Sequence, residues 1–129
     1  MENTTLVLDT SILIDYYRKT DKENSVWVNL VKNRYDFSIS VVTKYEIYSG
    51  ATKSQLIFWN SIFKMIEVKS FDEVTSDIAV KINADLKRKR KQIDIADLFI
   101  AATAVACNCP LATLNKKHFE RIDGLEIIY

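Results

Sequence analysis

The sequence has few of the residues that build several common kinds of site. Its 129 residues include two glycines, one proline, two cysteines and one histidine. Neither G-x-x-x-x-G-K-[ST] nor G-x-G-x-x-G occurs, which excludes the P-loop and the dinucleotide-binding fingerprint. A Cys–His pair or a Ser–His–Asp triad would have to take its base from His118. We therefore expect any catalysis to depend on carboxylates.

The two cysteines lie close together, as C-N-C at Cys107 and Cys109. This spacing is too short for an easy disulfide, and with a lone histidine the two thiols cannot complete an ordinary zinc site. We expect two free thiols, which is typical of a cytoplasmic protein.

Long apolar segments are also absent. The longest apolar run, Leu98 to Cys107, is too short for a bilayer span, which needs ~20 residues. Only a few apolar residues precede Asp9, so we do not expect the first residues to act as a signal peptide. Hydrophobic residues make up 48% and charged residues 27%, as in globular proteins, so we expect a single domain over residues 1–129 without membrane association. The net charge of +1 argues neither for nor against binding to nucleic acid.

Short apolar runs alternate with segments of helical periodicity along the chain. The pattern predicts strands at 6–8, 36–40, 65–69, 111–113 and 125–129. It predicts helices at 12–18, 26–34, 41–49, 54–63, 71–89, 94–107 and 116–121. This alternation indicates an α/β fold with a mainly parallel central sheet between helical layers, in which ligands bind beyond the carboxyl ends of the strands.

An aspartate ends the first apolar run. Asp9 follows the predicted strand Leu6–Leu8 and precedes Thr10 and Ser11, of which one would cap the next helix. Aspartate is unfavourable inside a strand and costly to bury, so Asp9 is either a capping residue or a metal ligand. Its place at a strand end favours a ligand.

Three further acids bear on this choice. Glu46 lies among apolar neighbours in the helix that follows the second predicted strand, where it is either half-buried or simply solvated. Asp94 and Asp97 are three residues apart and share one face of the helix that they open. A D-x-x-D pair at a helix start resembles a capping box, so we predict that Asp94 is mainly an N-cap and that Asp97, beside an alanine-rich face, is functional.

The order of these motifs resembles the PIN domain family, and within it the VapC toxins of toxin–antitoxin pairs. The resemblance extends from Leu6 to Ile127, and it implies a PIN-like three-layer α/β/α domain. The motifs are D-T-S at 9–11, T-x-x-E at 43–46, D-x-x-D-L-x-I-A-A-T-A at 94–104, and L-A-T-L-N-x-x-H-F-x-R-I-x-G-L at 111–125.

The resemblance also implies the site. The metal-binding acids of the family fall on Asp9, Glu46 and Asp97, which would be the catalytic residues, and Asp94 matches a position that is often acidic. The fourth acid of the family would lie within 113–119, where the nearest match is the neutral Asn115. In place of that acid, Asp94 or a bound water would complete a second metal site, so Asp94 is a fourth candidate metal ligand. The residues expected to support ligands or substrate by hydrogen bonds are Thr10, Ser11 and Asn115.

Clustered carboxylates repel one another unless cations neutralise them, and hard oxygen ligands select Mg²⁺ or Mn²⁺. The resemblance implies a Mg²⁺-dependent endoribonuclease toxin, with Mn²⁺ as a substitute, that cuts structured RNA such as tRNA or rRNA loops by metal-activated water. It further implies a VapB-like antitoxin as partner and a homodimer. The alternative is a catalytically silent PIN module that binds RNA or a protein. A haloacid-dehalogenase-like phosphatase is disfavoured, because its second Asp is replaced by Ser11.

A run of five cations precedes the D-x-x-D helix. Such a run is either a solvated helix end, where cations complement the dipole, or a phosphate-binding track. We predict RNA binding by Lys87, Arg88, Lys89, Arg90 and Lys91.

Overall fold

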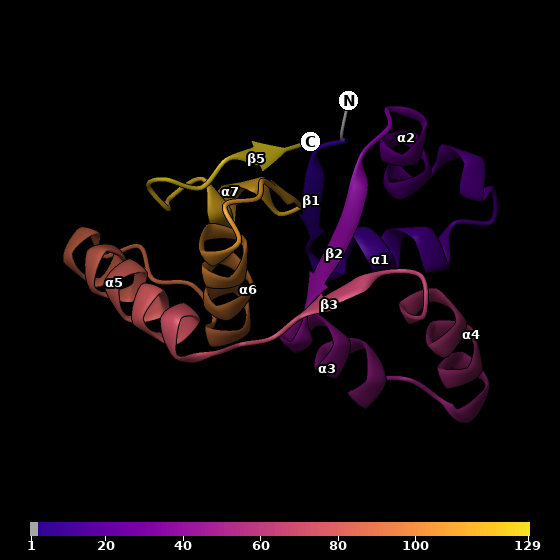
Figure 1. Cartoon of the computed structure of the whole chain (residues 1–129), viewed down its shortest axis with the longest axis horizontal. Helices are drawn as coiled ribbons and strands as arrows, with labels where there is room; N and C mark the ends of the chain where they lie inside the picture. Colours follow the sequence, from indigo (N-terminus) through magenta and orange to yellow (C-terminus); the bar gives the residue numbers. More distant parts are fainter. Residues whose placement is uncertain (1–2) are drawn as a thin grey trace.

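A five-stranded parallel sheet forms the centre of the protein. The computed structural model describes residues 3–129. The strand order is β3-β2-β1-β4-β5, and every neighbouring pair is parallel, as shown in Figure 1. The strands are β1 (Thr5–Leu8), β2 (Asp36–Ser40), β3 (Glu67–Lys69), β4 (Leu111–Ala112) and β5 (Ile127–Ile128).

Helices cover both faces of this sheet, which confirms the predicted three-layer α/β/α fold (Figure 1). Helices α1, α2 and α4 pack on one face, while α5, α6 and α7 pack on the other. Helix α3 follows β2 directly and contributes side chains to both clusters. The helices are α1 (Thr10–Arg18), α2 (Val26–Lys32), α3 (Val41–Ser49), α4 (Lys53–Phe63), α5 (Glu73–Lys89), α6 (Ile95–Ala106) and α7 (Lys116–Phe119), with a 3-10 turn η1 (Lys22–Asn24).

The central strand β1 explains why the sequence starts with an unbroken apolar run. Leu6 and Leu8 pack into the cluster that contains α1, α2 and α4, whereas Val7 packs on the opposite face with residues of α5 and α6. All three are fully buried, and burying each such side chain contributes about 1.5–3 kcal/mol. Asp9, directly after β1, therefore lies at the centre of the carboxyl edge of the sheet.

Several helix boundaries differ from the prediction because of capping. Helix α1 begins at Thr10, so Asp9 and neither Thr10 nor Ser11 holds the N-cap position, and the Asp9 side chain makes no capping hydrogen bond. Helix α5 begins at Glu73 instead of residue 71, because the carboxylate of Asp72 accepts a 2.9 Å hydrogen bond from the Thr75 N–H.

Other boundaries also differ from the prediction. Helix α4 begins one residue early, since Thr52 and Gln55 form a capping box. Helix α2 ends at Lys32, before the predicted residue 34, and Arg34 has a left-handed φ of 63°. Strands β3, β4 and β5 are two or three residues long, shorter than the apolar segments that predicted them. No helix within residues 3–129 has the length and apolar character needed to cross a membrane.

Candidate active site

A pocket of about 660 Å³ opens at the carboxyl edge of the sheet. It brings together residues from four separate parts of the chain: Asp9 after β1, Glu46 on α3, Asp97 on α6, and Asn115 after β4. The rest of its lining comes from α1 and the following residue, and from the loop after β4, as Thr10, Ser11, Ile14, Asp15, Arg18, Lys19 and Leu114. Three of the predicted acids and all three predicted supporting residues thus share one hollow.

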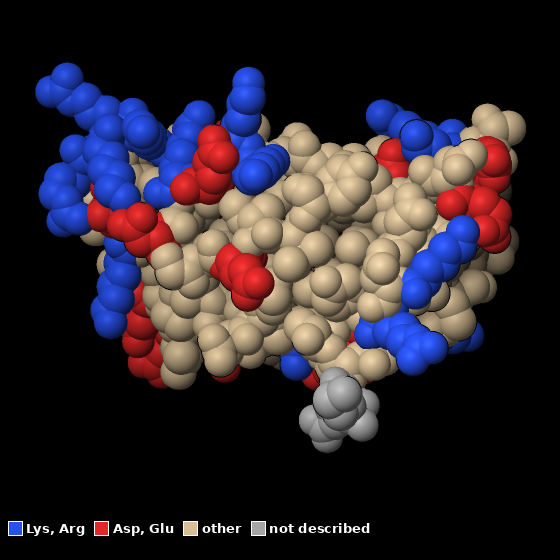
Figure 2. Space-filling model, turned by 90° about the horizontal axis from the view of Figure 1, so that it is seen from above, with Lys and Arg blue, Asp and Glu red and all other residues tan. Residues whose placement is uncertain are grey.

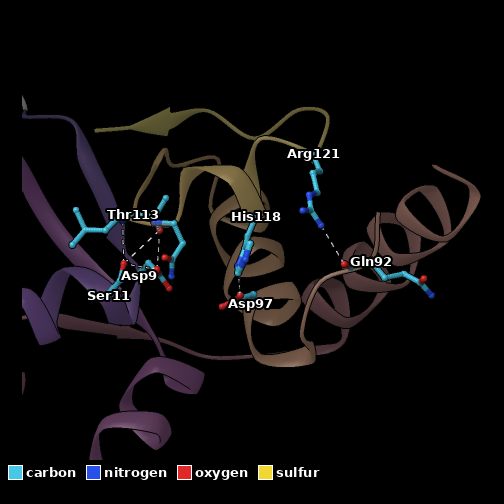
Figure 3. A network of polar contacts seen from close by, with 9 residues as sticks. Asp9, Ser11, Gln92, Asp97, Thr113, His118 and Arg121 are labelled. Atoms are coloured by element: carbon cyan, nitrogen blue, oxygen red, sulfur yellow. Dashed lines mark hydrogen bonds and ion pairs between the residues drawn. The ribbon is translucent and has the colours of Figure 1, made fainter. Parts of the chain in front are cut away.

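Asp9 is held through one of its two oxygens. The Ser11 hydroxyl donates to Asp9 Oδ2 at 2.7 Å and the Thr113 hydroxyl donates to the same oxygen at 2.8 Å (Figure 3). Each hydroxyl in turn accepts a backbone N–H, from Leu114 at 3.1 Å and from Asn115 at 2.9 Å. Among the described residues, no group donates to Asp9 Oδ1, which leaves this oxygen available to a ligand in the pocket.

Glu46 is tied to the same wall of the pocket by Thr10. The Thr10 hydroxyl lies 2.7 Å from Glu46 Oε1 and 3.3 Å from the hydroxyl of the fully buried Thr43. A hydroxyl carries one hydrogen, and the shorter contact indicates donation to the carboxylate. Thr10 therefore fixes the orientation of Glu46 and links the start of α1 to α3.

Asp97 lies in an unfavourable place for a charge. Burial raises the pKa of its carboxyl above the usual range, the negative charge of Asp9 raises it further, and Asp94 adds a small contribution. The contact between His118 Nδ1 and Asp97 Oδ2, at 3.4 Å, acts on this pKa in the opposite direction. Asp97 and Asp9 repel each other across the pocket, and a bound cation would relieve this repulsion.

The carboxylate and amide oxygens that line the pocket fit a Mg²⁺ or Mn²⁺ ion that keeps much of its water. Within residues 3–129, no three His, Cys, Asp or Glu side chains converge closely enough to enclose an ion by themselves. Mg²⁺ commonly takes one or two carboxylates together with several water molecules. Asp9 and Asp97 are the pair that would hold such an ion, with Glu46 and Asn115 within the same pocket.

Asp94 does not behave as the sequence predicts. It occupies the N-cap position of α6, but its side chain makes no capping hydrogen bond, so the prediction of a side-chain cap is wrong. The exposed carboxylate lines a neighbouring hollow with Gln92 and Arg121 instead of the pocket that holds Asp9. A role for Asp94 as a metal ligand stays a prediction.

Replacing Asp94 by Ala should therefore change the free energy of unfolding by less than about 0.5 kcal/mol, because only a weak, exposed interaction with the helix dipole is lost. Urea unfolding of the metal-free protein measures this change. Asp72→Ala is the matched control, since its capping hydrogen bond exists and its loss should cost about 1 kcal/mol. Equal losses for the two variants would contradict this reading of Asp94.

The basic run lies away from the pocket, at the end of α5 and in the following loop. Arg88 and Lys89 both form ion pairs with Asp85, and Lys89 also contacts Asp123 at 3.0 Å. Figure 2 shows Lys and Arg side chains gathered at this end of the molecule and again at the opposite end. RNA binding by Lys87–Lys91 stays a prediction.

Several residues that the fold brings to the site were not among the predicted site residues. Thr113 is fully buried and holds Asp9 across a separation of 104 positions, while His118 contacts Asp97. Arg18 and Lys19 also line the pocket, where their positive charges are opposite in sign to those of the acids. The position of Thr113 at the end of a predicted strand was the one available signal.

Comparisons with known proteins place the chain in a family. The family model described as "PIN domain" matches residues 6–125. Ribonuclease VapC1 of Methanocaldococcus jannaschii is 37% identical over 129 residues, covering 98% of this chain and 88% of the relative. The tRNA(fMet)-specific endonuclease VapC of Shigella flexneri is 31% identical over 124 residues, covering 92% of each chain.

Among solved structures, the DNA-bound VapBC complex of Salmonella typhimurium contains a chain that is similar with a TM-score of 0.84 and 27% identity, covering 97% of each chain. A chain of VapBC-1 from nontypeable Haemophilus influenzae has the same fold, with a TM-score of 0.85 at 23% identity. Together with the sheet order and the acids at its carboxyl edge, these matches show that the chain belongs to the PIN domain family, among the VapC ribonucleases.

Proposed function

We propose that this protein is the toxin of a toxin–antitoxin pair and acts as a Mg²⁺-dependent endoribonuclease on structured RNA. The observation that supports this most directly is the convergence of Asp9, Glu46 and Asp97 in one pocket, with Asp9 held through Oδ2 alone. A carboxylate anchored in this way presents its second oxygen in a fixed direction. That arrangement suits a site that must bind a cation beside a phosphodiester.

The residues of the chain have distinct parts in this mechanism. When bound, the metal ion supplies an activated water and stabilises negative charge on the departing oxygen. Asp9 and Asp97 would hold the ion, and Ser11 and Thr113 keep Asp9 from rotating. Glu46, held by Thr10 on the wall of the same pocket, would accept a hydrogen bond from the attacking water. The products would be 5′-phosphate and 3′-hydroxyl ends.

A VapB-like antitoxin is the partner that we propose for this chain. The similar solved structures include VapBC complexes from Salmonella typhimurium and Rickettsia felis. The open pocket also has room for a cationic side chain from a partner, which the acids would attract. We also propose that the protein forms a homodimer.

The proposal predicts metal-dependent cutting. Purified protein should cleave a tRNA or rRNA-derived stem-loop in Mg²⁺ or Mn²⁺ and should stop in EDTA, because the acids repel the phosphates without a cation. Gel analysis of end-labelled RNA gives the rate and the position of the cut. Cleavage that persists after complete chelation would overturn the mechanism. A protein that neither cuts RNA nor binds Mn²⁺ would support the silent-module alternative.

Asn115 provides a second prediction. It lines the pocket at the place where the family has its fourth acid, so Asn115→Asp should tighten Mn²⁺ binding by adding a carboxylate. Isothermal titration calorimetry measures the affinity. Asn33→Asp, at the exposed end of α2, is the control and should leave it unchanged. Unchanged affinity for Asn115→Asp would mean that its side chain does not reach the ion.

A further inference from the structure

The pocket at the acids is the first of three hollows that adjoin one another. Leu114 and Asn115 line both the pocket and a second hollow of about 540 Å³ beside α7. His118 lines this second hollow and also a third, of about 450 Å³, between α7 and the loop before α6. Figure 3 shows the residues of this row, from Asp9 past Asp97 and His118 to Arg121 and Gln92. We call the three hollows together the groove.

Cations lie in the groove on both sides of the acids. Arg18 lines the wall formed by α1, and on the other side Lys116 and Lys117 line the hollow beside α7. All three are exposed, and within residues 3–129 none of them forms an ion pair. Two cations of the basic run differ in this respect, since Arg88 pairs with Asp85 and Lys89 pairs with both Asp85 and Asp123. Exposed cations without an acidic partner remain available for phosphates.

The far end of the groove is more mixed in charge. Arg121 lines the third hollow and donates a 3.4 Å hydrogen bond to the carbonyl of Gln92, which holds its guanidinium there. The acids Glu120 and Asp94 line the second and third hollows. Strong binding is therefore expected next to the catalytic acids, at Arg18 and Lys117, and weaker binding toward Arg121.

An endonuclease needs a path for the strand on both sides of the bond that it cuts. Arg18 lines the pocket that holds the acids, and Lys117 lines the hollow that joins this pocket at Leu114 and Asn115. A polyanion that runs from one cation to the other is therefore attracted at both ends and repelled only at the acids, where a cation is expected. An acidic protein segment could use the same cations, but it has no reason to cross the acids. The arrangement therefore favours an RNA strand.

We propose that single-stranded RNA lies along this groove, with the phosphates on one side of the cut bound by Arg18 and those on the other side bound by Lys116 and Lys117. This proposal rests on the endoribonuclease function proposed above. It assigns the backbone contacts nearest the cut to α1 and α7, and it makes the basic run Lys87–Lys91 unnecessary for them.

The first test is binding without cleavage. All variants carry Asp97→Asn, and the probe is a fluorescein-labelled single-stranded RNA oligonucleotide of mixed sequence, followed by anisotropy. Arg18→Gln and Lys117→Gln should each raise Kd about tenfold, because each removes a charge-assisted contact. Each should also reduce the slope of log Kd against log salt by about 0.7, as expected for one lost phosphate contact. Lys64→Gln, an exposed lysine that lines none of the three hollows, is the control and should leave both values unchanged.

The second test uses an RNA whose cut bond has been mapped with the unmodified protein. Arg18→Gln and Lys117→Gln should each raise KM with little change in kcat. The Arg18→Gln effect should disappear when one flank of the RNA is removed, and the Lys117→Gln effect only when the opposite flank is removed. Loss of both effects with the same flank would overturn the path across the acids.

Two other outcomes would also decide against the groove. Affinity and salt slope equal to those of Lys64→Gln would show that the cations do not bind RNA. Weaker binding of a co-expressed antitoxin, with RNA affinity unchanged, would assign the cations to a protein partner. Failure of the unmodified protein to cut any RNA would instead contradict the proposed function, and the binding measurements would still report on the groove.

Discussion

Asp97→Asn is expected to abolish RNA cleavage while leaving the metal-free protein at least as stable as the parent. The pKa of Asp97 is raised by burial and by the charge of Asp9, so its ionised form is unfavourable in the folded state. Asparagine has nearly the same shape without this charge, but it is a poor ligand for Mg²⁺. Asp9→Asn should likewise abolish cleavage, since it weakens the same pair. Activity is measured with end-labelled RNA and stability by urea unfolding in EDTA.

The pH dependence of stability gives a second measure of the same repulsion. A carboxyl whose folded-state pKa is raised stabilises the fold while protonated, and that contribution is lost as the pH rises through the folded pKa. The metal-free parent protein should therefore lose stability as the pH rises through the folded-state pKa of Asp97, and Asp97→Asn should lose less stability over the same pH range. Asp77→Asn, an exposed position on α5, is the control and should keep the parent profile. Lower metal-free stability of Asp97→Asn than of the parent would contradict the assignment of Asp97 to a metal site.

The fold was largely predictable because its signals are local. The run Leu6–Leu8 is apolar on both faces, which is typical of a central parallel strand, and the structure buries it completely. Helix ends were less predictable, since a cap is decided by one hydrogen bond. Asp72 accepts such a bond and starts α5, whereas Asp94 occupies the same position on α6 without one. The two cases look alike in the sequence.

The sequence predicted the acids of the site and the supporting hydroxyls of Thr10 and Ser11, but it did not predict the contact of Thr113 with Asp9. Asp9, Glu46 and Asp97 stand in motifs whose order resembles a known family, and the fold brings them to one pocket. The bond from Thr113 to Asp9 links positions that are far apart in the sequence, so no local pattern indicates it. Arg18 is the last residue of α1 and lines the pocket. The sequence predicts the end of this helix but not that the helix end lies beside the acids.

Thr113→Val should weaken metal binding and catalysis strongly, although Thr113 is buried and does not line the pocket. Valine keeps the shape of this fully buried side chain but removes the hydroxyl that donates to Asp9 Oδ2 and accepts from the Asn115 N–H. Asp9 would then keep one of its two hydroxyl donors, Ser11, and would rotate more freely. Loss of a hydrogen bond that orients a metal ligand typically costs about 10–100-fold in metal affinity or activity.

Two further variants separate this positioning role from a general loss of stability. Thr113→Ser keeps the hydroxyl and, unlike Thr113→Val, should keep most of the parent's Mn²⁺ affinity and kcat/KM. Thr103→Val removes another buried hydroxyl, one that bonds to the Phe99 carbonyl and lies 3.3 Å from Ser40 Oγ, so it should cost stability without changing Mn²⁺ affinity. Calorimetry with Mn²⁺ on the three folded proteins makes the comparison. Parent-like Mn²⁺ affinity in Thr113→Val would mean that Ser11 alone orients Asp9, and the role assigned to Thr113 would be wrong.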